Sequence, residues 1–451
     1  MDAQEEKYIR MTTPPVERLI RRLALPCIIS MLVTSFYNMA DTYFVGMLHS
    51  NAATGAVGVA YSVMAVIQAV GFFFGHGSGN FISRELGRKN YDEASRMAAT
   101  GFVSALGAGL LICIFGQIFM EPLAVFLGST ETILPYTIAY LRVILLGAPW
   151  MCASFVVNNQ LRFQGSAAYA MVGIVTGAVI NIGLDPVLIF GLNMGVAGAG
   201  WATIISQFVS FCLLLAGTRR GGNIRLKLSN FRFSLHYYSW ILKGGLPSLA
   251  RQGLASAATI CLNNATMAYG DAAIAAMGVV QRVMNFGASA MIGFGQGFQP
   301  VCGFNYGAQL YSRVRRGFWY SVKLSAAALL AIAALGFCFA PQLIALFRDD
   351  PEVIAYGAKA LRFQCVTFFL QAWVVIGNMM QQAIGKTVPA TFIAAARQGL
   401  FFIPAVWILN AAFGFTGVQL SQSVADLITF LVSIPIQAKI LRELPADQPQ
   451  Q

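Results

Sequence analysis

The segment LALPCIISMLVTSFYNMADTYFVG, Leu23 to Gly46, is an almost unbroken apolar run that contains one acidic residue, Asp41. As an α-helix, a run of this length extends about 36 Å, which is enough to cross a hydrocarbon core of about 30 Å. The run is apolar on all sides and does not alternate, so we expect a helix and not a barrel strand. The segment therefore predicts a membrane-spanning helix that carries a carboxylate near its end.

The composition extends this prediction to the whole chain. Of its 451 residues, 57% are hydrophobic and 11% are charged, far from the averages of soluble domains. We therefore predict an all-α polytopic membrane protein. The eight cysteines lie in apolar runs without CxxC spacing, so they indicate neither a disulfide framework nor a zinc site. The basic N-terminal segment leads into an apolar run that is too long for a cleavable signal.

Turn and charge signals divide the apolar sequence into twelve predicted membrane spans. They lie near residues 18–46, 52–79, 95–120, 132–158, 167–190, 196–218, 241–268, 272–300, 314–339, 352–378, 387–411 and 416–440. Lys and Arg concentrate in alternate connections, whereas the opposite loops, such as GMLHSNAATG and GLNMG, contain almost none. By the positive-inside rule both termini are expected in the cytoplasm. The net charge of +12 is thus explained by membrane topology, and we expect no nucleic-acid partner.

The two halves of the chain share landmarks in one nearly constant register. Pro26 falls opposite Pro247, FGHG from Phe74 falls opposite FGQG from Phe294, and Asn158 falls opposite Asn378. We predict an N-terminal tail (1–14), a six-helix bundle (15–218), a cytoplasmic linker (219–240), a second six-helix bundle (241–442) and a C-terminal tail (443–451). Two pseudo-symmetric bundles of equal orientation are typical of transporters.

Three carboxylates lie well inside predicted spans: Asp41, Asp185 and Asp426. Asp41 lies 18 residues beyond Leu23 and Asp185 lies 18 residues beyond Ala167, in helices of the same direction. We therefore expect both acids at a similar level, about 27 Å along their helices. Polar groups expected nearby are Tyr37, Asn38, Asn181 and Thr203. Such a cluster can carry a proton or hold a hard monovalent cation, and the residues do not separate these alternatives; a third is that the acids only join helices.

The second half departs from this pattern. Asp41 maps to Cys261 or Leu262 and Asp185 maps to Ala405, so the coupling site is predicted in the first bundle alone. The second half instead embeds the arginines Arg251, Arg282 and Arg397. These either contact backbone carbonyls and interfacial water, or attract anionic groups. Asp426 either lines a cavity or is structural.

Other signals bear on mechanism. Pro26 removes a backbone hydrogen bond from the helix of Asp41 and predicts a kink. GHGSG, Gly75 to Gly79, ends a membrane helix instead of joining a strand to a helix, so it does not predict nucleotide binding; its glycines fit close helix contacts. The three histidines are scattered. We predict no enzyme and no cofactor, and any transport is expected to be secondary.

Several stretches together resemble the multidrug and toxic compound extrusion (MATE) family, in its DinF-like and MepA-like branch. They are ALP before the core of the first span, NMADTYFVG, RELGRKNYDEA, NIGLDPVLIFGLNMGVAGAGWAT and GFNYGA, and the resemblance covers residues 15 to 442. It implies two six-helix bundles that export cationic, amphipathic drugs by alternating access, against an inward flow of H⁺ or Na⁺. It places the cation site, including any Na⁺, on Asp41, Asn181, Asp185 and Thr203, with Tyr37 and Asn158 nearby.

The expected partners are drug-like small molecules and the lipid bilayer, for a monomer in the plasma membrane of a prokaryote. Candidate residues for the substrate cavity are Asn158, Asn38, Met39, Met171, Gln207, Met284, Met291 and Arg251, the methionines because their soft side chains suit promiscuous surfaces. The alternative function is a flippase for lipid-linked or anionic headgroup substrates, which the embedded arginines would favour.

Overall fold

The computed structural model describes residues 3–48 and 50–447, and every regular element in these ranges is a helix. The chain forms two compact units. Unit 1 contains the chain up to Met11 together with Ile29–Gly245, and unit 2 contains Thr12–Ile28 together with Leu246 to the C-terminus. The chain therefore passes between the units three times: after Met11, within its second α-helix after Ile28, and within its ninth α-helix after Gly245.

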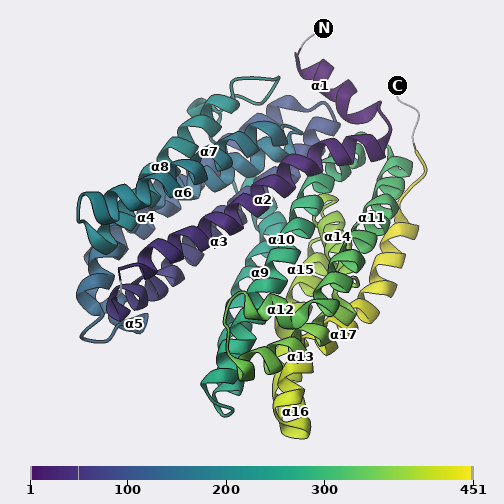
Figure 1. Cartoon of the computed structure of the whole chain (residues 1–451). Helices are drawn as coiled ribbons and strands as arrows, with labels where there is room; N and C mark the ends of the chain where they lie inside the picture. Colours follow the sequence, from purple (N-terminus) through teal and green to yellow (C-terminus); the bar gives the residue numbers. More distant parts are fainter. Residues whose placement is uncertain (1–2, 49, 448–451) are drawn as a thin grey trace. The chain divides into compact units, whose positions relative to one another are not determined.

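The helices of the first half are labelled in Figure 1. They are α1 (Ala3–Thr12), α2 (Val16–Gly46), α3 (Asn51–Gly87), α4 (Tyr91–Ile118), α5 (Met120–Phe126), α6 (Leu134–Phe163), α7 (Ala167–Pro186), the π-helix η1 (Val187–Gly191), α8 (Gly195–Gly217) and the short 3₁₀-helix η2 (Leu228–Asn230). Within unit 1, α6 packs against α3, α4 and α8 and is the most buried of the spans. It forms the centre of this unit.

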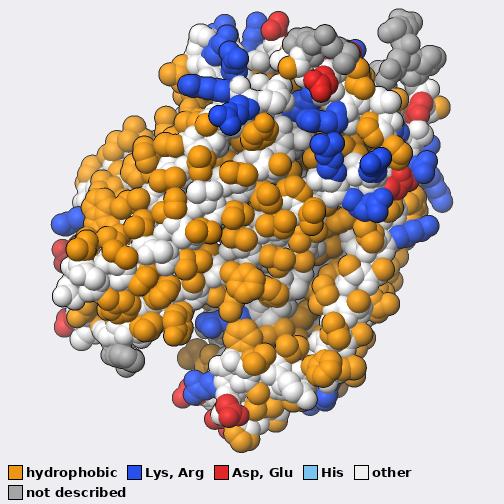
Figure 2. Space-filling model, turned by 45° about the horizontal axis from the view of Figure 1, so that its top comes forward, with side chains coloured by type: hydrophobic (Ala, Val, Ile, Leu, Met, Phe, Trp, Pro, Cys, Tyr) orange, Lys and Arg blue, Asp and Glu red, His pale blue; other side chains and the backbone are white. Residues whose placement is uncertain are grey.

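The second half contains α9 (Leu235–Met267), α10 (Asp271–Gly307), α11 (Tyr311–Cys338), α12 (Ala340–Ala345), α13 (Pro351–Phe368), α14 (Gln371–Ala383), α15 (Thr387–Ala395), the π-helix η3 (Ala396–Leu400), α16 (Phe402–Phe413) and α17 (Phe415–Glu443). Among the described residues, nine helices are long and apolar enough to cross a membrane, or ten if a bent pair counts as one span. On the face shown in Figure 2, hydrophobic side chains cover most of the surface, and most of the visible Lys and Arg gather at the top and right of the view.

Long helical segments cover each of the twelve predicted spans, with one correction. The span predicted at 352–378 is broken into α13 and α14, which are bent by 55°. No proline or glycine occurs at Phe369 and Leu370, between these two helices, so the sequence carries no local signal for the break. The span predicted at 387–411 corresponds to one apolar helical segment, Thr387–Phe413, that contains η3, and α1 lies within the predicted N-terminal tail.

Glycines let the crossing helices approach closely in both units. In unit 2, a Cβ atom at Gly297 of α10 would lie 2.3 Å from the Ala24 Cα atom in the first part of α2. In unit 1, a Cβ atom at Gly77 of α3 would lie 2.4 Å from the Ile241 carbonyl oxygen in the first part of α9. Only glycine fits at such a backbone contact. The predicted role of the GHGSG glycines in close helix contacts is confirmed, and Gly297 of FGQG has the same role in unit 2.

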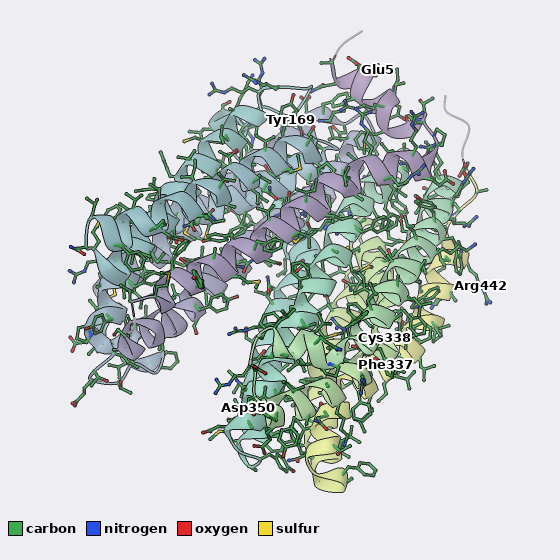
Figure 3. All side chains as sticks on the ribbon, viewed as in Figure 1. Glu5, Tyr169, Phe337, Cys338, Asp350 and Arg442 are labelled. Carbon is green, nitrogen blue, oxygen red and sulfur yellow. The ribbon has the colours of Figure 1, made fainter. Side chains whose placement is uncertain are left out.

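Helix α1 docks on unit 1 through buried and polar contacts. Its Lys7 ammonium donates to the Ser166 hydroxyl at 3.1 Å and to the Asn223 side-chain carbonyl oxygen. Glu5 pairs with Lys89 at 3.0 Å. Figure 3 shows Glu5 and Tyr169, near the start of α7, at the same end of this unit. The N-terminal residues thus hold together the turn before α7 and the loop that follows α8.

Candidate cation site

The two acids of the first half meet inside unit 1. Asp41 lies near the end of α2, and Asp185 lies at the end of α7, where its side chain is fully buried (0% exposed). The two carboxylates interact electrostatically and repel each other. One oxygen of each, Asp41 Oδ1 and Asp185 Oδ1, is buried without a hydrogen-bond donor among the described residues. The site therefore has unused acceptor capacity at two points.

An amide links Asp185 to α8. In the orientation that satisfies both neighbours, the Asn181 amide donates to Asp185 Oδ2 at 3.1 Å and its oxygen accepts from the Thr203 backbone N–H at 3.3 Å. Asn181 lies one helical turn before Asp185, so both side chains project from the same face of α7. Thr203 is buried and donates its hydroxyl to the Ala199 carbonyl oxygen at 3.0 Å. The structure thus brings together the four residues expected to bind the cation.

Aromatic hydroxyls complete the cluster. Tyr37, one turn before Asp41 on α2, interacts with Thr203 and Gln207 of α8. Tyr140 of α6 is buried and interacts with both acids, with Tyr37 and with Thr203. The sequence analysis did not identify Tyr140. A signal was available, because a tyrosine within a membrane span needs a polar partner for its hydroxyl.

The chain between α7 and α8 explains how α8 reaches the acids. Asp185 is followed by Pro186 and by the π-helix η1, an irregularity that is frequent at functional sites. Asn193 and Gly195 then adopt positive φ angles of 51° and 57° in the turn to α8. A Cβ atom at Gly198 would lie 2.7 Å from the Leu188 carbonyl oxygen. The GVAGAG glycines therefore let α8 pack closely on η1, which brings Thr203 to the level of Asn181.

The chemistry of this cluster suits a small cation. None of the ion pairs among the described residues involves Asp41 or Asp185. Two carboxylates in a desolvated site repel each other unless a cation neutralises part of their charge. Both a proton on one carboxylate and a Na⁺ ion held by carboxylate, amide and hydroxyl oxygens meet this requirement.

Other candidate residues lie away from the acids. Asn158 donates its amide to the Ala170 carbonyl oxygen at 3.3 Å, and Asn378 makes the same contact with Ala390 in unit 2 at 2.5 Å. The two hydrogen bonds occupy equivalent positions of the repeat, and they join α6 to α7 in unit 1 and α14 to α15 in unit 2. The structure does not bring Asn158 to the cation cluster, because Asn158 lies near the opposite end of its helix.

The proposed cavity residues are divided between the two units. Asn38 and Met39 are exposed on α2 and Met171 is partly exposed on α7, in unit 1. In unit 2, Met291 is buried on α10, Met284 is partly exposed on the same helix, and Arg251 is partly exposed on α9. Pro26 lies in the part of α2 that belongs to unit 2, and the helix continues through it from Val16 to Gly46.

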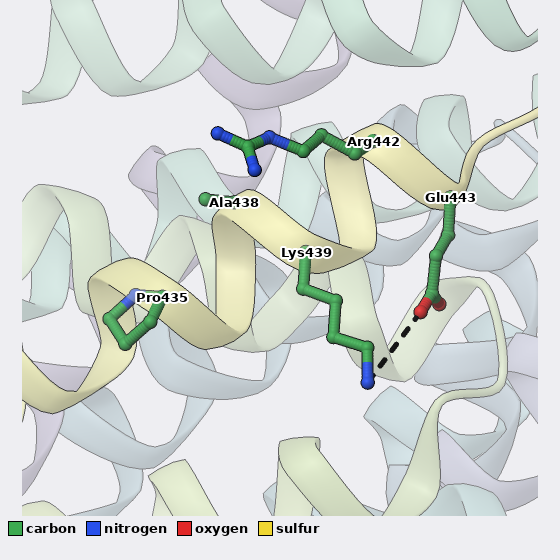
Figure 4. Close-up of a pocket in the computed structure, with 5 residues that line it drawn as sticks. All are labelled: Pro435, Ala438, Lys439, Arg442 and Glu443. Carbon is green, nitrogen blue, oxygen red and sulfur yellow. Dashed lines mark ion pairs between the residues drawn. The ribbon is translucent and has the colours of Figure 1, made fainter.

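Surface hollows lie elsewhere. One, of about 430 Å³, is lined by Pro435, Ala438, Lys439, Arg442 and Glu443, with Lys439 and Glu443 paired at 3.9 Å (Figure 4). All five residues come from the last turns of α17, so this hollow is an open groove beside one helix. Neither Asp41 nor Asp185 lines this groove.

A repeated helical membrane fold with a buried acidic cluster defines the chain as a membrane transporter. A family model for MatE matches residues 26–187 and again residues 247–408. The two matches begin at Pro26 and Pro247, the prolines that the sequence analysis aligned. They confirm the predicted internal repeat and its register, and the chain belongs to the MatE family.

Known relatives match over the full length. The chain is 27% identical to the multidrug export protein MepA of Staphylococcus haemolyticus, over 99% of this chain and 98% of the relative. Its structure is similar to a crystal structure of a MATE in the straight conformation, with a TM-score of 0.91, 26% identity and coverage of 97% and 98%. A MATE in the bent conformation gives a TM-score of 0.90 at 26% identity, with 98% of each chain covered. The resemblance to the MATE family and its MepA-like branch is confirmed.

Proposed function

We propose that the protein is a secondary active multidrug efflux transporter. It exports cationic or amphipathic small molecules by antiport with H⁺ or Na⁺, through alternating access, and carries out no catalysis. The observation that supports this most directly is the pair of buried carboxylates in unit 1, each with an oxygen that has no donor among the residues the structure describes. The name of the staphylococcal relatives, multidrug export protein, supports the same substrate class.

The coupling cation enters the cluster and neutralises part of its charge. Asp41 is on α2, whose first part belongs to unit 2 and whose remainder belongs to unit 1, with the change at Ile28 and Ile29. Pro26 lies just before this change and donates no backbone hydrogen bond, so α2 can bend there. Cation binding near one end of α2 is therefore proposed to change the bend, and with it the side to which the substrate site opens.

The membrane potential can drive export of a substrate only if the exchange moves net charge. One positive charge that enters down 100 mV releases about 2.3 kcal/mol, and a tenfold accumulation of a neutral solute requires about 1.4 kcal/mol. Exchange of a monovalent cationic drug for one proton moves no net charge, so the pH gradient or a second ion must drive it. We place both termini in the cytoplasm of a prokaryotic cell, with the transport bundles at residues 15–218 and 241–442, joined by the linker 219–240.

The test is dye efflux from proteoliposomes with a pH gradient or a Na⁺ gradient imposed one at a time. Asp41→Asn and Asp185→Asn are expected to abolish gradient-driven ethidium transport, because each removes a carboxylate from the cluster. Asp271→Asn is the matched control, since Asp271 is exposed in the first turn of α10. Normal ethidium transport by Asp41→Asn would contradict the coupling proposal.

A flippase for lipid-linked or anionic headgroup substrates is the second candidate function. The arginines embedded in unit 2 favour it, because a cation in the membrane attracts an anionic group. This function predicts transport that depends on Arg251 and is indifferent to cationic dyes.

A further inference from the structure

Unit 2 contains a membrane-embedded charge cluster with two arginines and one acid. Arg397 Nε donates to Asp426 Oδ1 at 2.8 Å, with the Arg397 side chain 23% exposed and that of Asp426 4% exposed. Asp426 also accepts from the Gln422 amide at 2.9 Å and, on its other oxygen, from the Gln371 amide at 3.1 Å. Both oxygens of the acid are therefore already occupied by donors from η3, α14 and α17.

Arg251 of α9 is the second cation of this cluster. Its guanidinium interacts repulsively with that of Arg397. Among the described residues Arg251 forms no ion pair or hydrogen bond of its own, and it is partly accessible. Packing brings the helix segments of the two arginines together. Leu254, one turn after Arg251, lies against Gly399, two residues after Arg397, and a Cβ atom at Gly399 would be 2.8 Å from Leu254 Cδ2. Two guanidinium groups thus lie near each other, and among the described residues only that of Arg397 is paired with the Asp426 carboxylate.

The cluster lies deep in the membrane-spanning part of its helices. Arg251 lies near the middle of α9, and Asp426 lies in the first half of α17. These positions correspond to about 24 Å and about 16 Å from the starts of two helices that run in opposite directions. Embedded arginines at such depth are rare and mark functional sites by default.

The arginines are not a requirement of the six-helix repeat. In the register that the two family matches define, Arg251 falls opposite Ser30 and Arg397 falls opposite Thr176. The same fold is thus built in unit 1 without either charge. Arg397 also lies in the π-helix η3, a local irregularity of the kind that frequently occurs at functional sites.

We propose that Arg251 and Arg397 bind the carboxylate of an amphiphilic substrate. Asp426 and its two glutamine partners position Arg397, and Arg251, which has no acceptor of its own among the described residues, supplies the free donors. A guanidinium pair suits a carboxylate because each planar fork donates two parallel hydrogen bonds. This inference rests on the proposed export function and names a substrate class for it: amphiphiles that carry an acidic group.

The experiment compares two dyes that share one chromophore, a rhodamine carboxylic acid and its methyl ester. Binding to the full-length protein in nanodiscs of neutral lipid is measured by fluorescence anisotropy. Arg251→Gln is expected to raise the Kd of the acid about tenfold or more, because one charge-assisted hydrogen bond is lost, and to leave the Kd of the ester unchanged. Arg251→Lys is expected to recover part of the affinity.

Controls separate binding from folding. Arg282→Gln removes an exposed arginine of the same unit and is expected to leave both dyes unaffected. Arg397→Gln leaves Asp426 buried without its cation and is prone to misfold, so the double variant Arg397→Gln with Asp426→Asn is used and should again weaken only the acid. An unchanged Kd of the acid in Arg251→Gln, or equal weakening of both dyes, would overturn the proposal.

Two further arms identify the source of the anionic group. Soluble short-chain phosphatidylglycerol is titrated against the bound acid dye. If phosphatidylglycerol displaces the bound dye at a lower concentration than added dye acid does, the site binds a lipid headgroup. That result would overturn the substrate assignment. If the unaltered protein exports no ethidium, the proposed function fails, whereas the dye-acid measurement still decides the binding site.

Discussion

The docking of α1 on unit 1 should strengthen as pH rises. Lys7 is 5% exposed, and its ammonium donates to a hydroxyl and to an amide oxygen and pairs with no carboxylate in the described part of the chain. Burial, and secondarily the charge of Arg10, lowers the pKa of Lys7 from 10.5 to about 7. An undocked α1 therefore binds more protons than a docked one between about pH 7 and pH 10.5. Docking is weakest below pH 7, where Lys7 is protonated in both the docked and the undocked state. It strengthens as the pH rises from 7 to 10.5.

The size of the effect follows from the same shift. Each pH unit inside this window adds about 1.4 kcal/mol to the docking free energy. Between pH 7.5 and pH 9 the gain is therefore about 2 kcal/mol, which corresponds to a change of about 30-fold in the docking equilibrium. The neutral amine of Lys7 still donates to Ser166, so the contact is retained when the proton leaves.

Hydrogen exchange measured by mass spectrometry on the protein in nanodiscs tests this. Protection of peptides from α1, corrected for the intrinsic pH dependence of exchange, should rise over that interval. Lys7→Gln should make the protection independent of pH, whereas Lys227→Gln, an exposed linker residue, should leave the dependence intact. Protection that is flat or falls with pH in the unaltered protein would refute the reasoning, as would a slope that persists in Lys7→Gln.

Three other predictions concern single positions. Gly297→Val places its Cβ atom 2.3 Å from the α2 backbone and should lower the free energy of unfolding by about 1–3 kcal/mol, seen as a lower thermal unfolding midpoint. Gly278→Val, whose Cβ atom meets nothing within 4 Å, should leave the midpoint nearly unchanged. Asp350→Ala removes the acceptor of two backbone N–H groups in the first turn of α13 and should lower the stability of that turn by about 0.5–2 kcal/mol. Amide hydrogen exchange there should become faster, whereas Asp349→Ala, at the neighbouring exposed position, should leave it unchanged. Asn181→Ala removes the donor 3.1 Å from the buried carboxylate one turn further along, so the cation-free carboxylate loses about 1.5–3 kcal/mol of stabilisation. The half-saturating cation concentration of dye efflux should therefore fall at least about tenfold, and an unchanged value would count against the site.

Part of the site could be predicted from the chain alone. Asp41 and Asp185 stand out because a carboxylate within an apolar run is unfavourable enough to need a reason. Their equal distance from the starts of two parallel helices predicted a common level, and the structure brings them together. Tyr140 and Asn158 show the limit of this reasoning. A hydroxyl near one end of a span and an amide near the other both look like polar groups in an apolar run. They lie on the same face of α6, about five turns apart, and the structure shows that the acids lie at the level of Tyr140.

The sequence by itself determined the solvent, the helical class, the near positions of the spans and the internal repeat. These properties depend on local hydrophobicity, on turn residues and on charge between spans, which any short window of the chain displays. Only the tertiary structure decided that the first parts of α2 and α9 pack in the units opposite to their remainders, and that Arg251 lies beside Arg397. Such contacts join residues far apart in the chain, and they depend on how helix faces and glycine contacts fit together, which no local window contains.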